Sequence, residues 1–249
     1  MSVVLDTSVQ IARIFGSKDK KSRISEVIDN NACYCTVYVL GEFYATIIND
    51  YATMYAIIDQ ADDLNEAEKK VNEKAFYRSQ SRMHKIFIFL RERYDNNLSD
   101  IQLYIKTVFD LLIHKFYKGI EKNLLSGSKC NRANAYIEYV EGCPIVQNLN
   151  CRKTDNHCDI STLWNNYYDI ISKLADEHAV NEKIKRTIAA TTASIPPKGN
   201  NCRSVGDCVI CLEAIDENID TVCTNNSTDF LPITKHLGLK LIVPQYSNK

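Results

Sequence analysis

Four acidic residues that are far apart in the sequence stand where they could bind a metal ion together. Asp6 follows the short apolar run Val3–Leu5, and Glu42 follows a second run rich in Tyr, Val and Thr. Asp207 begins an apolar helical pattern, and Asp229 lies in a polar loop after a third apolar run. Carboxylate oxygens are the hard ligands that Mg²⁺ and Mn²⁺ prefer. An ion bound there could activate a water molecule and stabilise charge on a phosphodiester.

Each of these residues also has a purely structural explanation. A single Asp or Glu beside the start of a helix commonly caps the helix or interacts with its dipole. Taken one at a time, the four residues fit that explanation better than a metal site. The metal-site prediction therefore rests on the set of four.

The amino-terminal residues predict alternating strands and helices. Val3–Leu5 predicts a buried strand, followed by a tight turn and a helix. Cys33–Leu40 is rich in β-formers and predicts a second strand. Gly41 interrupts that run, and apolar residues then recur at helical spacing as far as Tyr51.

The carboxy-terminal residues predict the same alternation. Asp207 and its neighbour Gly206 begin a helix, Ile219–Thr224 predicts a strand, Phe230–His236 a short helix and Leu239–Val243 a last strand. Ligands of open parallel sheets lie beyond the carboxyl ends of the strands. We therefore expect the four acidic residues at one edge of a single sheet.

The middle of the chain has a different pattern. From Asp62 to Pro197 apolar residues recur mainly at helical spacing, and Pro196, Pro197 and Gly199 resemble a closing linker. The predicted organisation is a discontinuous α/β domain, residues 1–61 plus 199–249, with a largely helical insertion at residues 62–198.

Four short segments together resemble the motifs of the PIN domain family. The opening Val-Val-Leu-Asp-Thr-Ser at residues 3–8 resembles its first motif, and Val37–Ile47, with Leu-Gly-Glu-Phe at residues 40–43, its second. Gly-Asp-Cys-Val-Ile at residues 206–210 resembles the third. Residues 224–230, followed by Leu-Gly-Leu at 237–239, resemble the last. The resemblance covers about the first 58 and the last 50 residues, with the motifs in the family's order.

The resemblance implies a three-layer α/β fold with a central parallel sheet, and a metal-dependent ribonuclease activity. Asp6, Glu42 and Asp207 match the family's metal-binding acids, and Thr7 would support them. Hydrolysis of RNA would be in-line and would leave a 5′-phosphate and a 3′-hydroxyl. The cofactor would be Mg²⁺ or Mn²⁺, and the substrate RNA.

The fourth acidic position has two alignments. Many family members have Thr-x-Asp there, which would place the acid at Asn226. Others have Thr-x-Asn-x-x-Asp-Phe, which this sequence follows, so that Asp229 is the acid and Thr224 and Asn226 support it. Because Asn226 replaces an acid in the first alignment, the alternative is a catalytically degenerate module that binds RNA or protein.

The size of the middle region separates this chain from compact members of the family, such as toxin ribonucleases. With 249 residues the chain is much larger. The insertion is expected to control substrate choice, bind a protein partner or form a homo-oligomer.

Charge is unevenly divided between the predicted parts. The chain has a net charge of −1, which argues against a protein that coats nucleic acid through overall positive charge. The α/β part has 9 basic and 13 acidic residues, and the insertion 21 and 18. A mildly basic insertion facing an acidic metal site would suit RNA. Two groups could hold phosphates or be solvated faces: Arg78, Arg82 and Lys85 on one helix, and Lys18, Lys20, Lys21 and Arg23 in a loop.

The ten cysteines suggest a second, less specific metal site. Cys130, Cys143, Cys151 and Cys158, with His157, lie in one part of the insertion and could hold structural zinc or an iron–sulfur cluster. Their spacing lacks the CxxC pairs of ordinary zinc modules. Two other pairs are expected to pack in the core, Cys33 with Cys35 and Cys208 with Cys211.

The sequence predicts a soluble, cytoplasmic protein. The first apolar run is too short for a signal peptide, and Asp6 interrupts it. No later stretch has the roughly 18 uninterrupted apolar residues that a membrane helix needs. In a reducing compartment the cysteines would be free thiols or metal ligands rather than disulfides.

Overall fold

The computed structural model describes residues 1–74, 77–149 and 160–244. It divides into two compact units. The sheet unit comprises Met1–Phe43, Tyr117–Asn134 and Asn150–Lys249. The helical unit comprises Tyr44–Phe116 and Ala135–Leu149. Within the described residues, no helix is long and apolar enough to cross a membrane.

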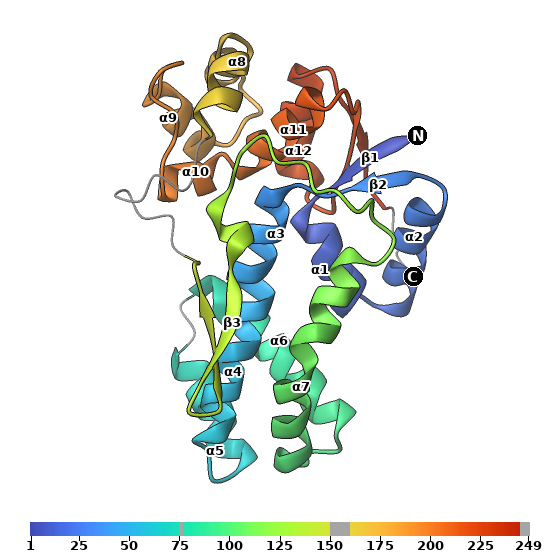
Figure 1. Cartoon of the computed structure of the whole chain (residues 1–249), viewed down its shortest axis with the longest axis vertical. Coiled ribbons are helices and arrows are strands. Elements are labelled where there is room, and N and C mark those ends of the chain that lie inside the picture. The colour runs from blue at the N-terminus through green and yellow to red at the C-terminus, as the bar shows by residue number, and fades with distance from the viewer. Residues whose placement is uncertain (75–76, 150–159, 245–249) are drawn as a thin grey trace. The chain divides into compact units, whose positions relative to one another are not determined.

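A parallel four-stranded sheet forms the centre of the sheet unit (Figure 1). Its strands are β1 (Ser2–Leu5), β2 (Ala32–Tyr34), β5 (Thr221–Cys223) and β6 (Lys240–Ile242), in the spatial order β2-β1-β5-β6. Val4 of β1 pairs with Tyr34 on one side and Val222 on the other. The central strands are fully buried, as expected for a parallel sheet covered on both faces.

Helical crossovers connect the parallel strands, as parallel pairing requires. Helices α1 (Thr7–Phe15) and α2 (Lys18–Asp29) lie between β1 and β2, and α12 (Ser227–His236) lies between β5 and β6. Helix α3 (Val37–Phe43) follows β2, and α11 (Gly206–Asp216) precedes β5. The mixed α/β class predicted from the sequence is confirmed.

Further helices of the sheet unit come from its later segments. Two short 3₁₀ helices, η2 (Asn131–Asn134) and η3 (Ser172–Asp176), accompany α8 (Ser161–Ile171), α9 (Glu182–Ala189) and α10 (Asn200–Ser204). Helix α8 packs on α11 and buries Leu163 and Trp164. His236 in α12 contacts the backbone oxygen of Ile170 in α8, 3.0 Å away.

The helical unit contains a π-helical segment, η1 (Tyr44–Ile48), and the helices α4 (Asn49–Asp59), α5 (Leu64–Lys74) and α6 (Tyr77–Arg93). Helix α7 (Leu98–Tyr117) ends at its boundary. An antiparallel hairpin, β3 (Tyr136–Val140) and β4 (Cys143–Gln147), packs on α4. The sequence did not predict this hairpin, because its few residues lie within a long stretch of helical spacing.

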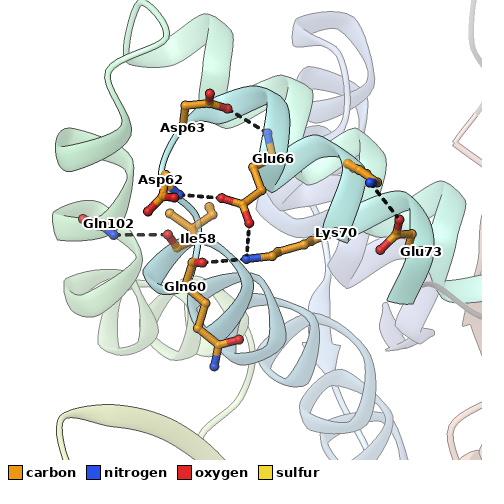
Figure 2. Close-up of polar contacts among 9 residues, drawn as sticks. Ile58, Gln60, Asp62, Asp63, Glu66, Lys70, Glu73 and Gln102 are labelled. Atoms are coloured by element: carbon orange, nitrogen blue, oxygen red, sulfur yellow. Dashed lines mark hydrogen bonds and ion pairs between the residues drawn. The ribbon is translucent and has the colours of Figure 1, made fainter.

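Polar contacts hold the turn between α4 and α5 (Figure 2). The Asp63 carboxylate accepts from the backbone N–H of Glu66 at 2.8 Å, and the Glu66 carboxylate accepts from the backbone N–H of Asp62 at 2.7 Å. Lys70 bonds both Glu66, at 2.7 Å, and the Gln60 carbonyl, at 2.6 Å. This is a variant of the capping box, which satisfies the free N–H groups of a helix start. The acidic residues here therefore have a structural role.

The second predicted strand is wrong in its extent. The expected run Cys33–Leu40 ends as a strand at Tyr34, and α3 begins at Val37 and includes Gly41. The Thr36 hydroxyl accepts from the backbone N–H of Val39 at 3.1 Å and so caps the helix. A buried apolar run favours strand or helix equally, and this cap decides between them.

The units also divide the chain at other points than the predicted domains, residues 1–61 plus 199–249 and 62–198. Residues 44–61, expected with the sheet, lie in the helical unit, whereas residues 117–134 and 150–198 lie in the sheet unit. Packing of α8 on α11 explains the second difference, because it joins part of the expected insertion to the helix that carries Asp207.

Candidate functional site

The four acidic residues singled out by sequence all lie in the sheet unit, on four different elements. Asp6 follows β1 and caps α1, and Glu42 lies in α3. Asp207 is in the first turn of α11, and Asp229 is in the first turn of α12. Electrostatic interactions connect Asp207 with the other three carboxylates. The fold therefore brings the predicted set together.

Asp6 is held by Ser8, in the first turn of α1, and by Thr224, directly after β5. Its side chain is 4% exposed, and its Oδ2 atom accepts from the Ser8 hydroxyl at 2.5 Å, the Ser8 N–H at 3.1 Å and the Thr224 hydroxyl at 2.9 Å. Burial raises the pKa of Asp6 above its ordinary value, and these hydrogen bonds oppose the rise. Ser8 was not among the predicted site residues, although it lies in the same motif.

Glu42 is bonded to the start of α1. The Thr7 hydroxyl donates to its Oε2 atom at 2.6 Å, which brings the first and second predicted motifs into contact. Burial raises the pKa of Glu42, the Thr7 hydrogen bond lowers it and the charge of Asp6 raises it. Thr7 thus contacts an acid as expected, but its partner is Glu42 rather than the adjacent Asp6.

The negative charges of the other three acids act on Asp207. Burial, followed by the negative charges of Asp6, Glu42 and Asp229, raises the pKa of Asp207 to about 8. Like charges gathered in a partly buried place repel one another. A bound cation would relieve that repulsion, so the cluster has the electrostatics of a cation site.

The last corner of the cluster is a hydrogen-bonded loop. Asn226 donates from Nδ2 to the Asp229 carboxylate at 2.8 Å, and its backbone N–H donates to the Thr224 hydroxyl at 2.9 Å. Asn225 donates from its backbone to the Ser8 hydroxyl at 2.9 Å. Thr224 and Asn226 therefore connect Asp229 with Asp6 through hydrogen bonds. In the second alignment these two residues are expected to support the acids.

A buried arginine beside Glu42 was not predicted. Arg132 in η2 is 3% exposed, and its guanidinium lies 5.1 Å from the centre of the Tyr38 ring. Burial lowers the pKa of Arg132, but the nearby Cys130, Tyr38 and Glu42 raise it overall. A Cβ on Gly41 would lie 2.8 Å from the Arg132 Cβ, so the glycine allows this close approach. No sequence pattern joins Arg132 to Glu42, because 89 residues separate them and only the tertiary fold places them together.

The chemistry of these donors suits a hard divalent cation, because carboxylate and hydroxyl oxygens are what Mg²⁺ and Mn²⁺ bind. Among the described residues, no three His, Cys, Asp or Glu side chains are already grouped closely enough to hold an ion. Hydroxyl groups donate to one oxygen of each of two carboxylates, Oδ2 of Asp6 and Oε2 of Glu42.

The proposed cysteine metal site cannot be assembled from the described residues. Cys130 is buried in the sheet unit, and Cys143 is half-buried in β4 of the helical unit. Cys151, His157 and Cys158 lie outside the described residues. The other pairs, Cys33 with Cys35 and Cys208 with Cys211, are buried as expected. Burial raises the pKa of Cys33 to about 11 and that of Cys35 to about 12, so these thiols are protonated at neutral pH.

The two expected basic groups differ from their predictions. Lys18, Lys20, Lys21 and Arg23 lie in the first turns of α2 rather than in a loop, because Ser17 caps a helix there. Arg82 forms an ion pair with the buried Asp50 and is not a free phosphate ligand. The side chain of Arg78 lies outside the described part of α6.

No protein-family model matches the chain, and neither the curated proteins nor the solved structures contain a match. The functional inference consequently depends on the chemistry of the residues themselves.

Proposed function

We propose that this chain is a divalent-metal-dependent endoribonuclease with a PIN-like arrangement of motifs. Asp6, Glu42, Asp207 and Asp229 would hold one or two Mg²⁺ or Mn²⁺ ions. One observation carries the proposal: four acids from distant segments lie near enough for three of them to raise the pKa of the fourth. A set of helix caps with unrelated roles has no reason to converge in this way.

Three of the four acidic residues have a supporting contact that suits this role. Ser8 and Thr224 orient Asp6, Thr7 orients Glu42, and Asn226 orients Asp229. Such hydrogen bonds limit rotation of the carboxylates and tune their basicity. When bound, the metal would lower the pKa of a coordinated water and neutralise charge on the scissile phosphate.

Isothermal titration of the metal-stripped protein with Mn²⁺ tests the proposed site. We expect binding to the unchanged protein and its loss, or a weakening of at least about tenfold, in both Asp6→Asn and Asp207→Asn, since these residues come from distant motifs. Asp220→Asn is the matched control, because Asp220 is an exposed aspartate that precedes β5 and pairs with Lys240. Equal binding by all four proteins would refute the shared site.

An RNA cleavage assay tests the activity itself. Cleavage should require Mg²⁺ or Mn²⁺, leave 5′-phosphate and 3′-hydroxyl ends, and disappear in Asp6→Asn while the protein remains folded. Full activity in the Asp6→Asn protein would reject the assignment.

The second candidate is a catalytically degenerate module that binds RNA or protein. The Asn226–Asp229 hydrogen bond favours it, because an amide stands where many PIN domains have an acid and ties up the neighbouring carboxylate. Absence of Mn²⁺ binding and of cleavage, with RNA binding retained, would support this candidate over the nuclease.

A further inference from the structure

A basic stretch without acidic residues leads directly to the carboxylate cluster. The 24 residues from Lys183 to Gly206 contain five basic residues and no acidic one, and Asp207 follows at once. The sheet unit as a whole has 20 basic and 18 acidic residues, whereas the helical unit has 10 and 13. Positive charge is therefore concentrated in the unit that holds the acids.

Four of the five cations face solvent. Helix α9 buries Ile184, Thr187 and Ile188, which leaves Lys183 and Arg186 exposed on its other side. Lys198 and Arg203 are exposed in the following segment and in α10. Lys185 pairs with Glu182 at 3.1 Å, and among the described residues this is the single ion pair of the stretch. We call Lys183, Arg186, Lys198 and Arg203 the α9–α10 cations.

Contacts with α3, the helix that carries Glu42, hold the end of this stretch in place. The Tyr38 hydroxyl donates to the Cys202 carbonyl at 3.4 Å, and a Cβ on Gly206 would lie 2.6 Å from that hydroxyl. Tyr38 lies one turn before Glu42 in α3. Its contact with Gly206 joins α3 to α11, the helix of Asp207, and its contact with Cys202 joins α3 to α10, the helix that carries Arg203.

The preceding residues are also held in place. Helix α10 packs on α9, and the Tyr168 hydroxyl donates to the Thr191 carbonyl at 2.8 Å. Pro196 and Pro197 are buried and have restricted backbones. The α9–α10 cations therefore belong to a backbone segment that is held by packing and hydrogen bonds.

We propose that the α9–α10 cations bind the phosphates of single-stranded RNA and lead that strand to the carboxylate cluster. This inference rests on the proposed function, which makes RNA the polyanion that the cations would hold. The cluster alone repels phosphates, so an RNA ligand needs cations close by. Lys and Arg at a surface supply that attraction through release of counterions from the strand.

Binding of a fluorescein-labelled single-stranded oligoribonucleotide, measured at several salt concentrations, tests the surface. The oligonucleotide has about 12 nucleotides, which is within the range of single-strand sites. The titration is done in EDTA, so that metal-dependent cleavage does not occur. The test variant combines Lys183→Gln, Arg186→Gln, Lys198→Gln and Arg203→Gln. The control variant combines Lys69→Gln, Lys106→Gln, Lys118→Gln and Lys122→Gln, which removes the same charge from exposed lysines outside the candidate phosphate-binding groups.

Each lost phosphate contact should reduce the slope of log affinity against log salt by about 0.7, so four contacts correspond to about 3. We expect such a reduction in the test variant and an unchanged slope in the control. Equal effects in both variants, or none in the test variant, would overturn the inference. The inference would also be overturned if the test variant lost binding to vesicles containing anionic lipid while its RNA binding stayed unchanged.

The single variant Arg203→Gln serves if the fourfold variant does not fold, and should reduce the slope by about 0.7. An unchanged slope for it would overturn the inference. Binding and cleavage also separate the two proposals. Absence of cleavage with the slope change intact rejects the nuclease and leaves the RNA surface, whereas cleavage with an unchanged slope rejects only the surface.

Discussion

At the scale of single residues, hydroxyl groups are as prominent in the cluster as carboxylates. Thr7, Ser8 and Thr224 donate at 2.5–2.9 Å to Asp6 or Glu42. A hydroxyl can donate to a carboxylate without adding charge, and it can turn to accept instead when a cation arrives. These residues therefore stabilise the buried acids without competing permanently for a metal.

Glu213 in α11 is a buried acid outside the cluster, and its protonation contributes to the free energy of unfolding. It is 0% exposed, its Oε1 atom accepts from the Ser128 N–H at 3.0 Å, and its Oε2 atom has no hydrogen-bond partner among the described residues. Burial raises the pKa of Glu213 to about 7 from 4.5, and contacts with Thr36 and Ser128 oppose the rise. The folded state therefore binds the proton more tightly than the unfolded chain.

The free energy of unfolding should consequently fall as pH rises from about 4.5 through 7, because folding then confines a charged carboxylate. The contribution is at most about 3 kcal/mol, at roughly 1.4 kcal/mol per pKa unit. Urea unfolding at pH 5 and pH 8 measures it. Glu213→Gln should lose less stability than the unchanged protein over this interval, whereas the exposed Glu217→Gln in the next turn should behave like the unchanged protein. Identical pH dependence in all three would contradict the prediction.

At the scale of elements, the position of α3 depends on how closely it approaches η2. Gly41 faces Arg132, and the residue after it is Glu42. Ala favours a helix over Gly by about 1 kcal/mol, but forcing atoms into a packed contact costs about 1–3 kcal/mol. The contact at 2.8 Å makes the second effect the larger one.

Gly41→Ala should therefore lower the free energy of unfolding by about 1 kcal/mol. It should also weaken Mn²⁺ binding, because Glu42 moves with the same turn. Urea unfolding and titration calorimetry check the two effects. In an Arg132→Gly background the Cβ contact is absent, so Gly41→Ala should cost much less there. An equal cost in both backgrounds would show that η2 is not the obstacle.

At the scale of the whole molecule, the predicted metal site is confined to one of the two units. All four acids and their hydroxyl partners belong to the sheet unit, although its chain comes from three separate segments. The buried Asp50, with its partner Arg82, belongs to the helical unit. Stability and metal affinity should therefore be separable by mutation.

Arg82→Met should destabilise the protein by about 1–3 kcal/mol, because Asp50 is left buried without its charge partner. The loss is smaller than for a fully buried ion pair, because Arg82 is partly exposed. Its affinity for Mn²⁺ should remain within about twofold of the unchanged protein, since Arg82 and Asp50 belong to the other unit and mutations at sites that share no partners are additive. Thermal unfolding and calorimetry give the two values. A large fall in affinity at a temperature where the variant is folded would contradict this separation.

Local patterns in the sequence determined the strands β1, β5 and β6, the helix starts at Asp207 and near Asp229, and the alternation that places acids at strand ends. These features depend on neighbours a few residues away, which is the range over which periodicity and capping act. The mixed α/β class followed from the same patterns.

Only the tertiary structure decided what distant segments do to one another. It placed α8 and α9 with the sheet, packed the β3–β4 hairpin on α4 and brought Arg132 beside Glu42. Apolar spacing shows that a face must be buried but not which partner buries it. The partner is chosen by packing and by the pairing of buried charges, which join residues far apart in the chain.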